Sequence, residues 1–308
     1  MILVILAHSL PQELFNVLGV PFLSRQAVPI FMLIMGYNAS KSFERRGEST
    51  FRELYAFKSI KSKVLKIVNP YLTYIVLNSL ALLALGSTSF KNIIFRTAIG
   101  GFGPGYYFTL ITIQAIFILP LIFKILDWKS KWTIPALFLG SLVIEVAVVS
   151  LGLPEPVFIL LIVPYIFAMV LGIYLAQNEV NLNKSLIFIG AMLSVLYIIY
   201  IDYLDNIIYI EKYWNSRHTP SYFYTLLVVV LLLKIPSKYL KNKASSLVIK
   251  VGQISFDVFL MQMLYFSILH ESNIQLPFIL NDIIAVIICC ILGLAFNKMN
   301  GKIMKILK

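Results

Sequence analysis

The sequence has 308 residues, of which 59% are hydrophobic and 13% charged; its formal net charge is +12 and its mean hydropathy +0.87. A soluble domain has about 25% charged residues, so a soluble protein of this length would need an exceptionally large core to bury so many apolar side chains. Apolar runs of about 20 residues, each long enough to cross roughly 30 Å of hydrocarbon as a helix, recur along the chain. The sequence therefore predicts an all-α, polytopic membrane protein.

Ten apolar segments are expected to form the membrane helices. In chain order they are 1–9, 22–39, 67–86, 106–126, 133–152, 157–176, 185–201, 220–234, 251–269 and 283–299. No internal repeat, low-complexity tract or linker separates them. Residues 1–308 are therefore expected to form a single integral membrane domain.

The first segment, MILVILAHS, is too short to be a complete span. A membrane helix needs about 20 residues, whereas a helix from Met1 to His8 reaches only about 12–13 Å, at roughly 1.5 Å per residue. Such a helix would also bury a charged amino terminus near the midplane of the bilayer. We therefore expect that the natural reading frame begins earlier, or that Met1 is an internal start.

The distribution of basic residues predicts which loops face the cytoplasm. The loop 41–66 is the most basic, and alternation of the spans then places four further segments on its side: 124–132, 177–184, 234–250 and 298–308. The opposite, outer side keeps only five of the 26 Lys and Arg residues: Arg25, Lys91, Arg96, Lys212 and Arg217. This asymmetry follows the positive-inside rule and predicts a plasma-membrane protein with both termini in the cytoplasm.

The same distribution explains the net charge of +12. Basic loops on the cytoplasmic face lie against anionic lipid headgroups, so membrane lipids are expected partners and nucleic acid is not. The two cysteines, Cys289 and Cys290, are adjacent in the last apolar segment and indicate neither a disulfide framework nor a metal site. The sequence has no Walker A, dinucleotide-binding or HExxH motif, which argues against an ATP-driven pump and a metalloprotease.

His8 is the first candidate for chemistry, because ionisable groups within membrane helices are costly and are commonly functional. One interpretation is a histidine at a helix end that faces the outer headgroups. The other is a buried base, since a neutral imidazole can take a proton from a hydroxyl near neutral pH. The sequence leaves both open.

The stretch KSKVLKIVNPYLTY, residues 61–74, is the second candidate. Lys63 and Lys66 lie three residues apart, on one helical face. They are either anchors that snorkel to the cytoplasmic boundary or a cationic clamp for a phosphorylated ligand from the cytosol. Pro70, which cannot donate a backbone hydrogen bond, would loosen the helix beside Tyr71.

Two later stretches place polar groups in apolar surroundings. GGFGPGYYFTLITIQ, residues 100–114, starts as a non-helical segment, continues with two tyrosines typical of an interfacial aromatic belt, and ends on Gln114 inside the span. GQISFDVFLMQMLYF, residues 252–266, carries Asp257 and Gln262.

Intramembrane acids allow a further interpretation. Glu145 and Asp257 are either polar contacts between helices or, if they meet in space, the paired acids of an ion-coupled transporter. His218 and His270 fall in the outer loops without ligand spacing. We expect both to be surface residues.

Taken together, these stretches resemble the acyltransferase-3 family of integral membrane O-acyltransferases, over nearly the whole chain. The family's first helix ends its signature in a histidine, as His8 does here, with an arginine eleven residues earlier that would lie upstream of Met1. AVPIFMLIMGYN is similar to the family's FFxxSGY, where Gly36 and Tyr37 match and Met35 replaces serine. Lys63, Lys66 and the Pro70-Tyr71 pair are similar to RxxRIxPxY, with lysine for arginine.

The resemblance continues in the second half of the chain. In the fourth helix, Tyr107 stands where the family often has Trp, Gln114 and Pro120 match, and Thr112-Ile113 replace a glutamate pair. Late in the chain, Gly252 to Gln262 is similar to GKxSYxxYLxH, with Phe256 for tyrosine and Gln262 for histidine.

The resemblance implies an enzyme that moves an acyl group, most often acetyl, from cytosolic acyl-CoA to a hydroxyl of an envelope polysaccharide or a lipid-linked sugar, without a permanently bound cofactor. It implies that His8 is catalytic and that Lys63, Lys66 and Tyr71 bind acyl-CoA. The acceptor would be bound by Tyr37, Tyr106, Tyr107, Gln114 and Gln262. The alternative is a glycan or lipid-intermediate translocator on the same scaffold, without transferase activity.

Overall fold

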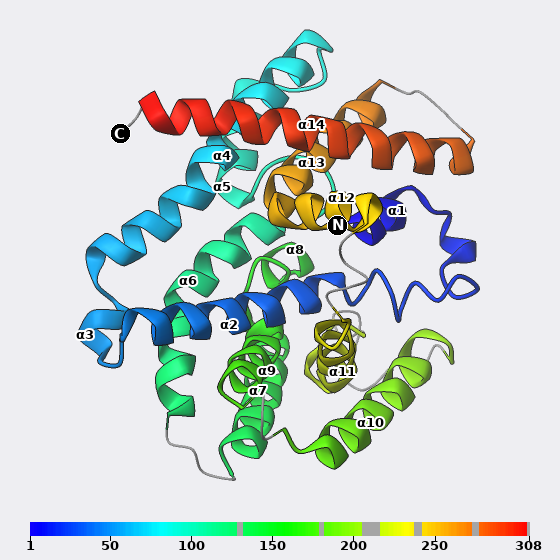
Figure 1. The fold of residues 1–308 in the computed structure, drawn as a ribbon. Coiled ribbons are helices and arrows are strands. Elements are labelled where there is room, and N and C mark those ends of the chain that lie inside the picture. The colour runs from blue at the N-terminus through cyan, green and yellow to red at the C-terminus, as the bar shows by residue number, and fades with distance from the viewer. Residues whose placement is uncertain (128–131, 179–181, 205–215, 237–241, 273–276, 307–308) are drawn as a thin grey trace. The chain divides into compact units, whose positions relative to one another are not determined.

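The computed structural model describes residues 1–127, 132–178, 182–204, 216–236, 242–272 and 277–306, and in these residues every regular element is helical (Figure 1). The α-helices are α1 (Ile2–Ser9), α2 (Ala27–Arg46), α3 (Phe51–Leu54), α4 (Phe57–Ala84), α5 (Phe90–Ile99), α6 (Tyr107–Leu126), α7 (Thr133–Ser150), α8 (Glu155–Phe158), α9 (Ile166–Gln177), α10 (Lys184–Asp202), α11 (Tyr222–Leu233), α12 (Lys243–Gln253), α13 (Ser255–Glu271) and α14 (Phe278–Ile306). Short 3-10 turns are η1 (Gln12–Leu14), η2 (Val163–Tyr165) and η4 (Thr219–Ser221). The predicted all-α fold is confirmed.

The long apolar helices make the chain a polytopic membrane protein. Each of the ten expected segments overlaps a helix. Among the described residues, five helical segments are long and apolar enough to cross a bilayer: Phe51–Ala84, Tyr107–Leu126, Thr133–Ser150, Lys184–Asp202 and Leu280–Ile303. A bent pair, Ser245–Gln253 with Ser255–Glu271, would make a sixth, and the expected count of ten stays a prediction.

The ninth expected span differs from the prediction of one straight helix. α12 and α13 meet at an angle of 80° within the expected segment 251–269. α12 has exposed apolar residues at Leu247, Val248 and Ile249 and a lysine, Lys250, in its last turn. Such an amphipathic helix is suited to the membrane interface rather than to the hydrocarbon, which explains why the span is broken there.

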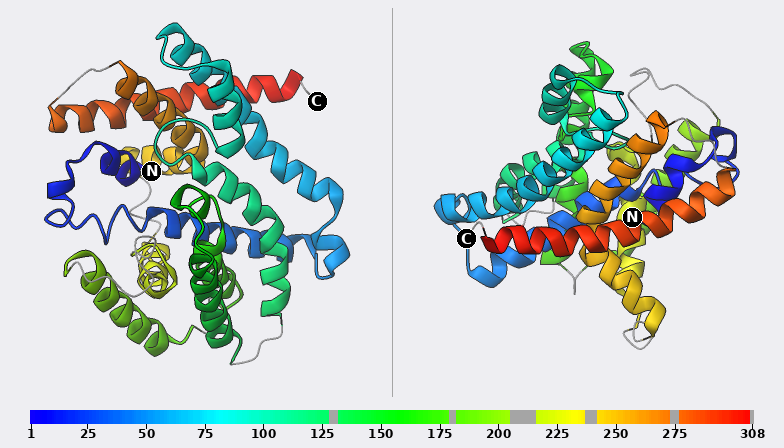
Figure 2. Two further views of the ribbon diagram at one scale, coloured as in Figure 1. Left: turned by 180° about the vertical axis from the view of Figure 1, so that it is seen from behind. Right: turned by 90° about the horizontal axis from the view of Figure 1, so that it is seen from above.

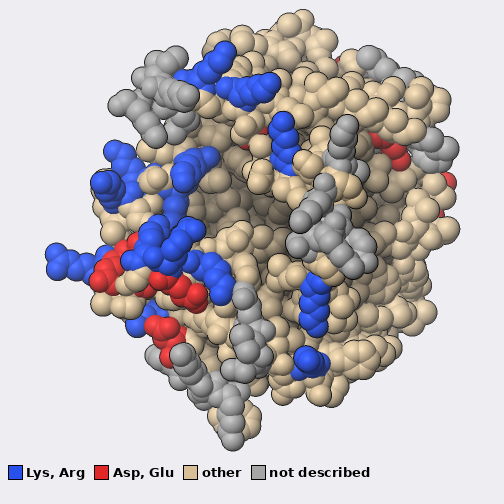
Figure 3. All heavy atoms as spheres, viewed as in Figure 1, with Lys and Arg blue, Asp and Glu red and all other residues tan. Residues whose placement is uncertain are grey.

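Basic side chains gather in one region of the face shown in Figure 3, at its left. Figure 1 draws α3 there, together with the adjoining ends of α2 and α4. These ends carry most of the loop 41–66 that is predicted to be cytoplasmic. Lys212 and parts of the other predicted cytoplasmic segments lie outside the described residues, so the orientation stays a prediction.

The chain forms two compact units. Unit 1 consists of Met1–Leu14, Ser62–Ile113 and Pro236–Lys308, and unit 2 of Phe15–Lys61 and Gln114–Ile235. Neither unit is one continuous stretch of chain, because the backbone passes between them along α4 and α6. The expectation of a single domain therefore stays a prediction.

Unit 2 is built around α9, whose residues from Phe167 to Ala176 are almost all buried. α9 packs most extensively against α2. A Cβ atom at Gly36 would clash with the carbonyl oxygen of Met169, and one at Gly172 with that of Leu33. The two glycines therefore let the helix backbones touch, as small residues do at helix crossings in membranes.

Unit 1 is built around α13. α14 crosses it, as Figure 2 shows, and α1 packs on α14. The apolar core joins Tyr74 and Leu82 of α4, Phe102, and Phe259 and Met263 of α13. The core leaves a cavity on one side, which residues from several segments of this unit line.

Candidate active site

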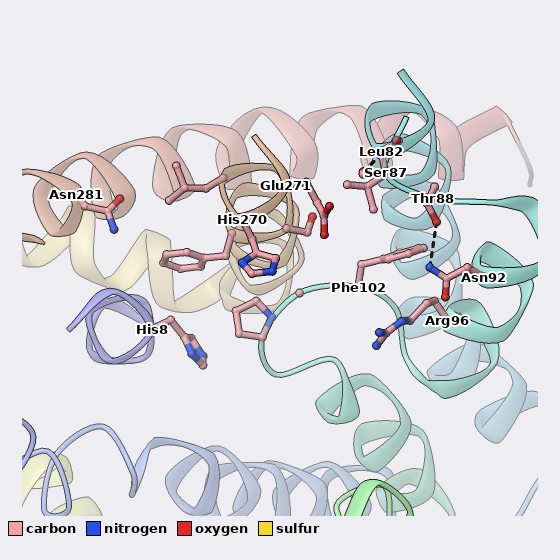
Figure 4. Close-up of a pocket in the computed structure, with 15 residues that line it drawn as sticks. His8, Leu82, Ser87, Thr88, Asn92, Arg96, Phe102, His270, Glu271 and Asn281 are labelled. Atoms are coloured by element: carbon pink, nitrogen blue, oxygen red, sulfur yellow. Dashed lines mark hydrogen bonds between the residues drawn. The ribbon is translucent and has the colours of Figure 1, made fainter. Parts of the chain in front are cut away.

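Unit 1 contains a cavity of about 750 Å³ (Figure 4). It is lined by residues from α1, the end of α4, α5, the glycine-rich segment 100–105 after α5, the end of α13 and the start of α14. Its volume lies in the range of small-molecule sites, roughly 300–1,000 Å³. The polar residues on its wall are His8, Ser87, Thr88, Asn92, Arg96, Ser267, His270, Glu271 and Asn281. The cavity can therefore hydrogen-bond a polar ligand on several sides.

The lining residues share a position in the predicted topology. All of them lie at the ends of the expected spans that face outward, or in the loops that join those ends, such as 87–105. With the predicted orientation, the cavity opens toward the outer leaflet.

A buried hydrogen-bond network fixes one wall of the cavity. The Tyr74 hydroxyl donates to the Phe102 carbonyl oxygen (2.6 Å) and accepts from the Phe102 amide (3.0 Å). Asn78 donates to the same hydroxyl (3.3 Å) and accepts from the Ser267 hydroxyl (2.7 Å). α4, the glycine-rich segment and α13 are thereby tied together. Deleting one partner would leave the others buried and unpaired, which costs about 1–3 kcal/mol for each group.

The glycine-rich segment also lies directly against α13. Gly103 has φ +79°, a left-handed conformation that favours glycine, and a Cβ atom there would clash with the carbonyl oxygen of Met263. This contact places Phe102, Gly103 and Pro104 on the cavity wall.

His8 stands on the wall contributed by α1. Ile5, one turn earlier, is fully buried in a cluster with Phe266 and Cys289, which anchors α1 in unit 1. The imidazole packs edge-on against the Phe266 ring, with 5.9 Å between ring centroids, and its side chain is exposed toward the cavity (Figure 4). An imidazole in this position can exchange a proton with a ligand held in the cavity.

Arg96 stands on the wall contributed by α5. It lies one turn after Asn92, whose amide donates to the Thr88 hydroxyl (3.1 Å). The Arg96 side chain points into the cavity in Figure 4, and its Nε atom is buried without a hydrogen-bond partner among the described residues. Arg96 was visible in the sequence only as one of the few basic residues on the outer side.

A family model described as an acyltransferase domain matches residues 1–297. The chain belongs to the acyltransferase-3 family. The resemblance of the sequence motifs to this family is thereby confirmed, and the protein is a membrane acyltransferase in general terms. No curated protein and no solved structure matches the chain.

The residues predicted to bind acyl-CoA lie along α4, on its stretch in unit 1. Lys63 is half-buried and Lys66 exposed. From Lys66 to Leu82, which lines the cavity, the helix extends roughly 24 Å at 1.5 Å per residue. Tyr71 is buried, and its hydroxyl donates to the Thr97 carbonyl oxygen (2.6 Å). In this acyltransferase, the lysine pair therefore lies far along α4 from the residue of that helix that lines the cavity.

The tyrosines predicted to bind the acceptor lie outside the cavity lining. Tyr106 and Tyr107 are half-buried in unit 1 and pack edge-on against each other, with 6.3 Å between centroids. Tyr37 is half-buried on α2 in unit 2, where the Lys41 Nζ lies 5.9 Å from its ring centroid. Their role in acceptor binding stays a prediction.

The two glutamines predicted to bind the acceptor differ in their surroundings. Gln114, in unit 2, donates to the Leu160 carbonyl oxygen (2.7 Å) and accepts from the Ile162 amide (3.1 Å), so both ends of its amide hold the chain before α9. Gln262, in unit 1, is 0% exposed, and neither atom of its amide has a partner among the described residues. Buried polar groups are rarely left without a hydrogen-bond partner.

The histidines assigned to the surface behave differently from each other. His270 is exposed, as expected, but it lines the cavity, which the sequence did not indicate. The prediction for His218 is wrong: it is only 3% exposed, and its ring lies 6.0 Å from that of Phe158 in unit 2. The reason is that the segment that follows it folds inward, with Thr219 and Ser221 fully buried.

The two intramembrane acids have local partners. Glu145, in unit 2, accepts from the Thr219 hydroxyl. Asp257, in unit 1, accepts from the amides of Asn297 (2.7 Å) and Asn300 (3.3 Å). Glu145 therefore contacts the 3-10 turn η4 and Asp257 contacts α14, while Glu145 Oε2 is buried without a partner among the described residues, so the role of both acids stays a prediction.

Proposed function

We propose that this acyltransferase moves an acetyl or other short acyl group from cytosolic acyl-CoA to a hydroxyl of an envelope polysaccharide or a lipid-linked sugar. The observation that carries the proposal is the position of His8 on the wall of a polar cavity, in a chain of the acyltransferase-3 family. The serine, threonine, asparagine and glutamate side chains around the cavity suit the many hydroxyls of a sugar, because each can donate or accept a hydrogen bond.

His8 is proposed as the general base. Its neutral imidazole takes the proton of the acceptor hydroxyl while that oxygen attacks the thioester carbonyl carbon. The carbon–sulfur bond breaks, coenzyme A leaves as a thiolate, and the imidazolium returns its proton to that sulfur. The products are an O-acyl ester and free coenzyme A, with no change in oxidation state.

Lys63 and Lys66 are proposed to hold the phosphates of coenzyme A. Ammonium groups bind phosphates as point charges, through charge-assisted hydrogen bonds. The half-buried and exposed positions of the two side chains leave them within reach of a ligand at this end of α4. Tyr71 would shape the helix beside them, since its hydroxyl already bonds to the Thr97 carbonyl oxygen.

Transfer of label tests the proposal directly. Membrane vesicles that carry the full chain are supplied with radiolabelled acetyl-CoA and envelope glycans, and the glycan and lipid-linked fractions are then counted. We expect label in one of these fractions, and none with vesicles that lack the chain. Intact acyl-CoA binding without any transfer would overturn the proposal and favour the translocator.

A further inference from the structure

The cavity in unit 1 contains a guanidinium group, which can bind an anion strongly. Arg96 is the only Lys or Arg among the described residues that line it. No carboxylate in the described part of the chain lies within ion-pair distance of its guanidinium, although Glu271 stands on another wall of the same cavity (Figure 4). The positive charge of Arg96 is therefore not paired with a carboxylate in the described part of the chain.

The guanidinium is also incompletely hydrogen-bonded. The Nε–H of Arg96 is buried and has no acceptor among the described residues. A buried donor without a partner is unfavourable, most of all when it is charged. A ligand with an anionic oxygen would supply the missing acceptor.

The surrounding structure fixes the backbone from which Arg96 projects. Ser89 caps the start of α5, where its hydroxyl accepts from the backbone amide of Asn92 (3.4 Å), and the Arg96 carbonyl oxygen accepts from the backbone amide of Gly101 (2.7 Å). The next residue, Thr97, is bonded to Tyr71 of α4 through its carbonyl oxygen. These three hydrogen bonds hold α5 in place without using the guanidinium.

We propose that Arg96 binds an anionic group of the acceptor, so that the cavity selects an acidic sugar over a neutral one. This inference rests on the proposed function and adds the substrate class. The planar guanidinium offers two parallel N–H donors that match a carboxylate or a phosphate. In a cavity of low dielectric that pairing is worth more than it would be in water.

The geometry assigns different tasks to the two ends of the acceptor. His8 and Arg96 stand on separate walls, contributed by α1 and α5. The anionic group would lie at Arg96 and the reacting hydroxyl at His8. Asn92, one turn before Arg96, would hydrogen-bond a neighbouring hydroxyl of the same sugar.

Binding of small probes tests the inference without any acyl transfer. The full chain is placed in nanodiscs of phosphatidylcholine, and saturation-transfer NMR, which detects weak binding, follows glucuronate, glucose 1-phosphate and glucose. We expect glucuronate or glucose 1-phosphate to bind and glucose to bind at least about tenfold more weakly. The anion that binds more tightly indicates whether the acceptor carries a carboxylate or a phosphate.

Variants at Arg96 assign the binding to that side chain. Arg96→Gln should lower the affinity for the anionic probe about 10- to 100-fold, and Arg96→Lys should recover part of it, because lysine keeps the charge but loses the fork of donors. Lys91→Gln is the matched control, since Lys91 is an exposed residue of the same helix that does not line the cavity. It should bind the probe as the wild type does.

The outcomes separate this inference from the proposed function. Equal binding of glucose and both anions, or unchanged anion binding in Arg96→Gln, would overturn the inference even if acyl transfer is observed. Anion binding that depends on Arg96, together with no transfer from acetyl-CoA, would overturn the proposed function only. Adding phosphatidylglycerol to the nanodiscs tests a headgroup as the source of the anion. If the sugar probe no longer binds when phosphatidylglycerol is present, the phosphate of the lipid headgroup occupies the site. That result would overturn the proposal of an acidic sugar.

Discussion

Three buried or half-buried glutamines show how the two units use their polar side chains. In unit 2, Gln26 donates to the carbonyl oxygens of Pro21 (3.2 Å) and Ser216 (2.7 Å) and accepts from Thr225 (3.0 Å). Gln114, in the same unit, is bonded to backbone at both ends of its amide. In unit 1, Gln262 has no partner at either end among the described residues.

The charged groups differ less clearly, since Glu145 Oε2 and Asp202 Oδ2 in unit 2 are also buried without a hydrogen-bond partner among the described residues. In unit 2, Arg25 is paired with Asp202 and Glu145 with Thr219. In unit 1, the guanidinium of Arg96 faces a cavity. Polar groups that are bonded to the protein stabilise helices against one another, whereas polar groups left open are available to a ligand. The cavity and the unpaired amide of Gln262 therefore favour unit 1 as the unit that would bind the ligand.

The largest effect is expected at His8. His8→Ala should lower acyl transfer about 10²- to 10⁴-fold, because a positioned general base typically contributes that much to the rate. The protein should still insert into the membrane and bind acyl-CoA. Leu3→Ala, at an exposed apolar position of the same helix, is the control. Transfer at the wild-type rate in His8→Ala would show that the histidine is only a boundary residue.

The lysine pair should show the next largest effect. The double change Lys63→Ala and Lys66→Ala should raise the KM for acyl-CoA about 10- to 100-fold, because each phosphate contact is charge-assisted. Thermal unfolding should stay almost unchanged, since lysines that only snorkel to a membrane boundary contribute little to stability. Lys58→Ala with Lys61→Ala, at exposed positions nearer the start of α4, is the matched pair. An equal rise in KM in both double variants would reject a specific clamp.

Gln114 and Gln262 test the comparison itself. Gln114→Leu removes the partners of two backbone groups, so we expect it to lower the free energy of unfolding by about 1–3 kcal/mol for each, with the acceptor KM unchanged. Gln262→Leu removes an amide that has no partner among the described residues, so stability should stay equal or rise. If that amide binds acceptor, its KM should rise. Thermal unfolding in detergent measures the stability of each variant, and acceptor titration measures its KM. A stable Gln114→Leu with a raised acceptor KM, together with a destabilised Gln262→Leu, would reverse the assignment of the two units.

The smallest effect is expected at Glu145. Glu145→Gln keeps an oxygen that can accept from Thr219, so stability should change by about 1 kcal/mol or less and acyl transfer should persist. Asp257→Asn should likewise leave activity in place. Loss of acyl transfer in either variant, with the fold retained, would contradict a structural role and favour the hypothesis that the two acids form an ion-coupling pair.

Much of the fold could be predicted from hydrophobicity alone. Each apolar run corresponds to a helix, because a backbone in hydrocarbon must satisfy its own hydrogen bonds. The 80° bend between α12 and α13 could not be read in this way, since the apolar run continues from Val251 into α13 while the amphipathic pattern lies before it. Hydrophobicity therefore predicts that a helix is present better than it predicts where the helix bends.

The candidate site was only partly visible in the sequence. His8 could be noticed because it interrupts an apolar segment. Arg96, His270 and Glu271 could not, since each is an ordinary polar residue of a segment expected to be an outer loop, and only tertiary structure brings the three to one cavity. His218 shows the converse, because a loop histidine is buried once its neighbours fold inward. Both outcomes depend on contacts between segments far apart in the sequence.

The crossing of α2 and α9 limits how the sequence can diverge. Since any side chain at Gly36 or Gly172 would meet the backbone of the other helix, a saturation library scored for protein level in the membrane should retain glycine at both positions. Gly140 and Gly301 are helical too, but a Cβ atom there meets nothing within 4 Å. These two positions should accept alanine and larger residues, so that the tolerance of each glycine reports how near the adjacent helix lies.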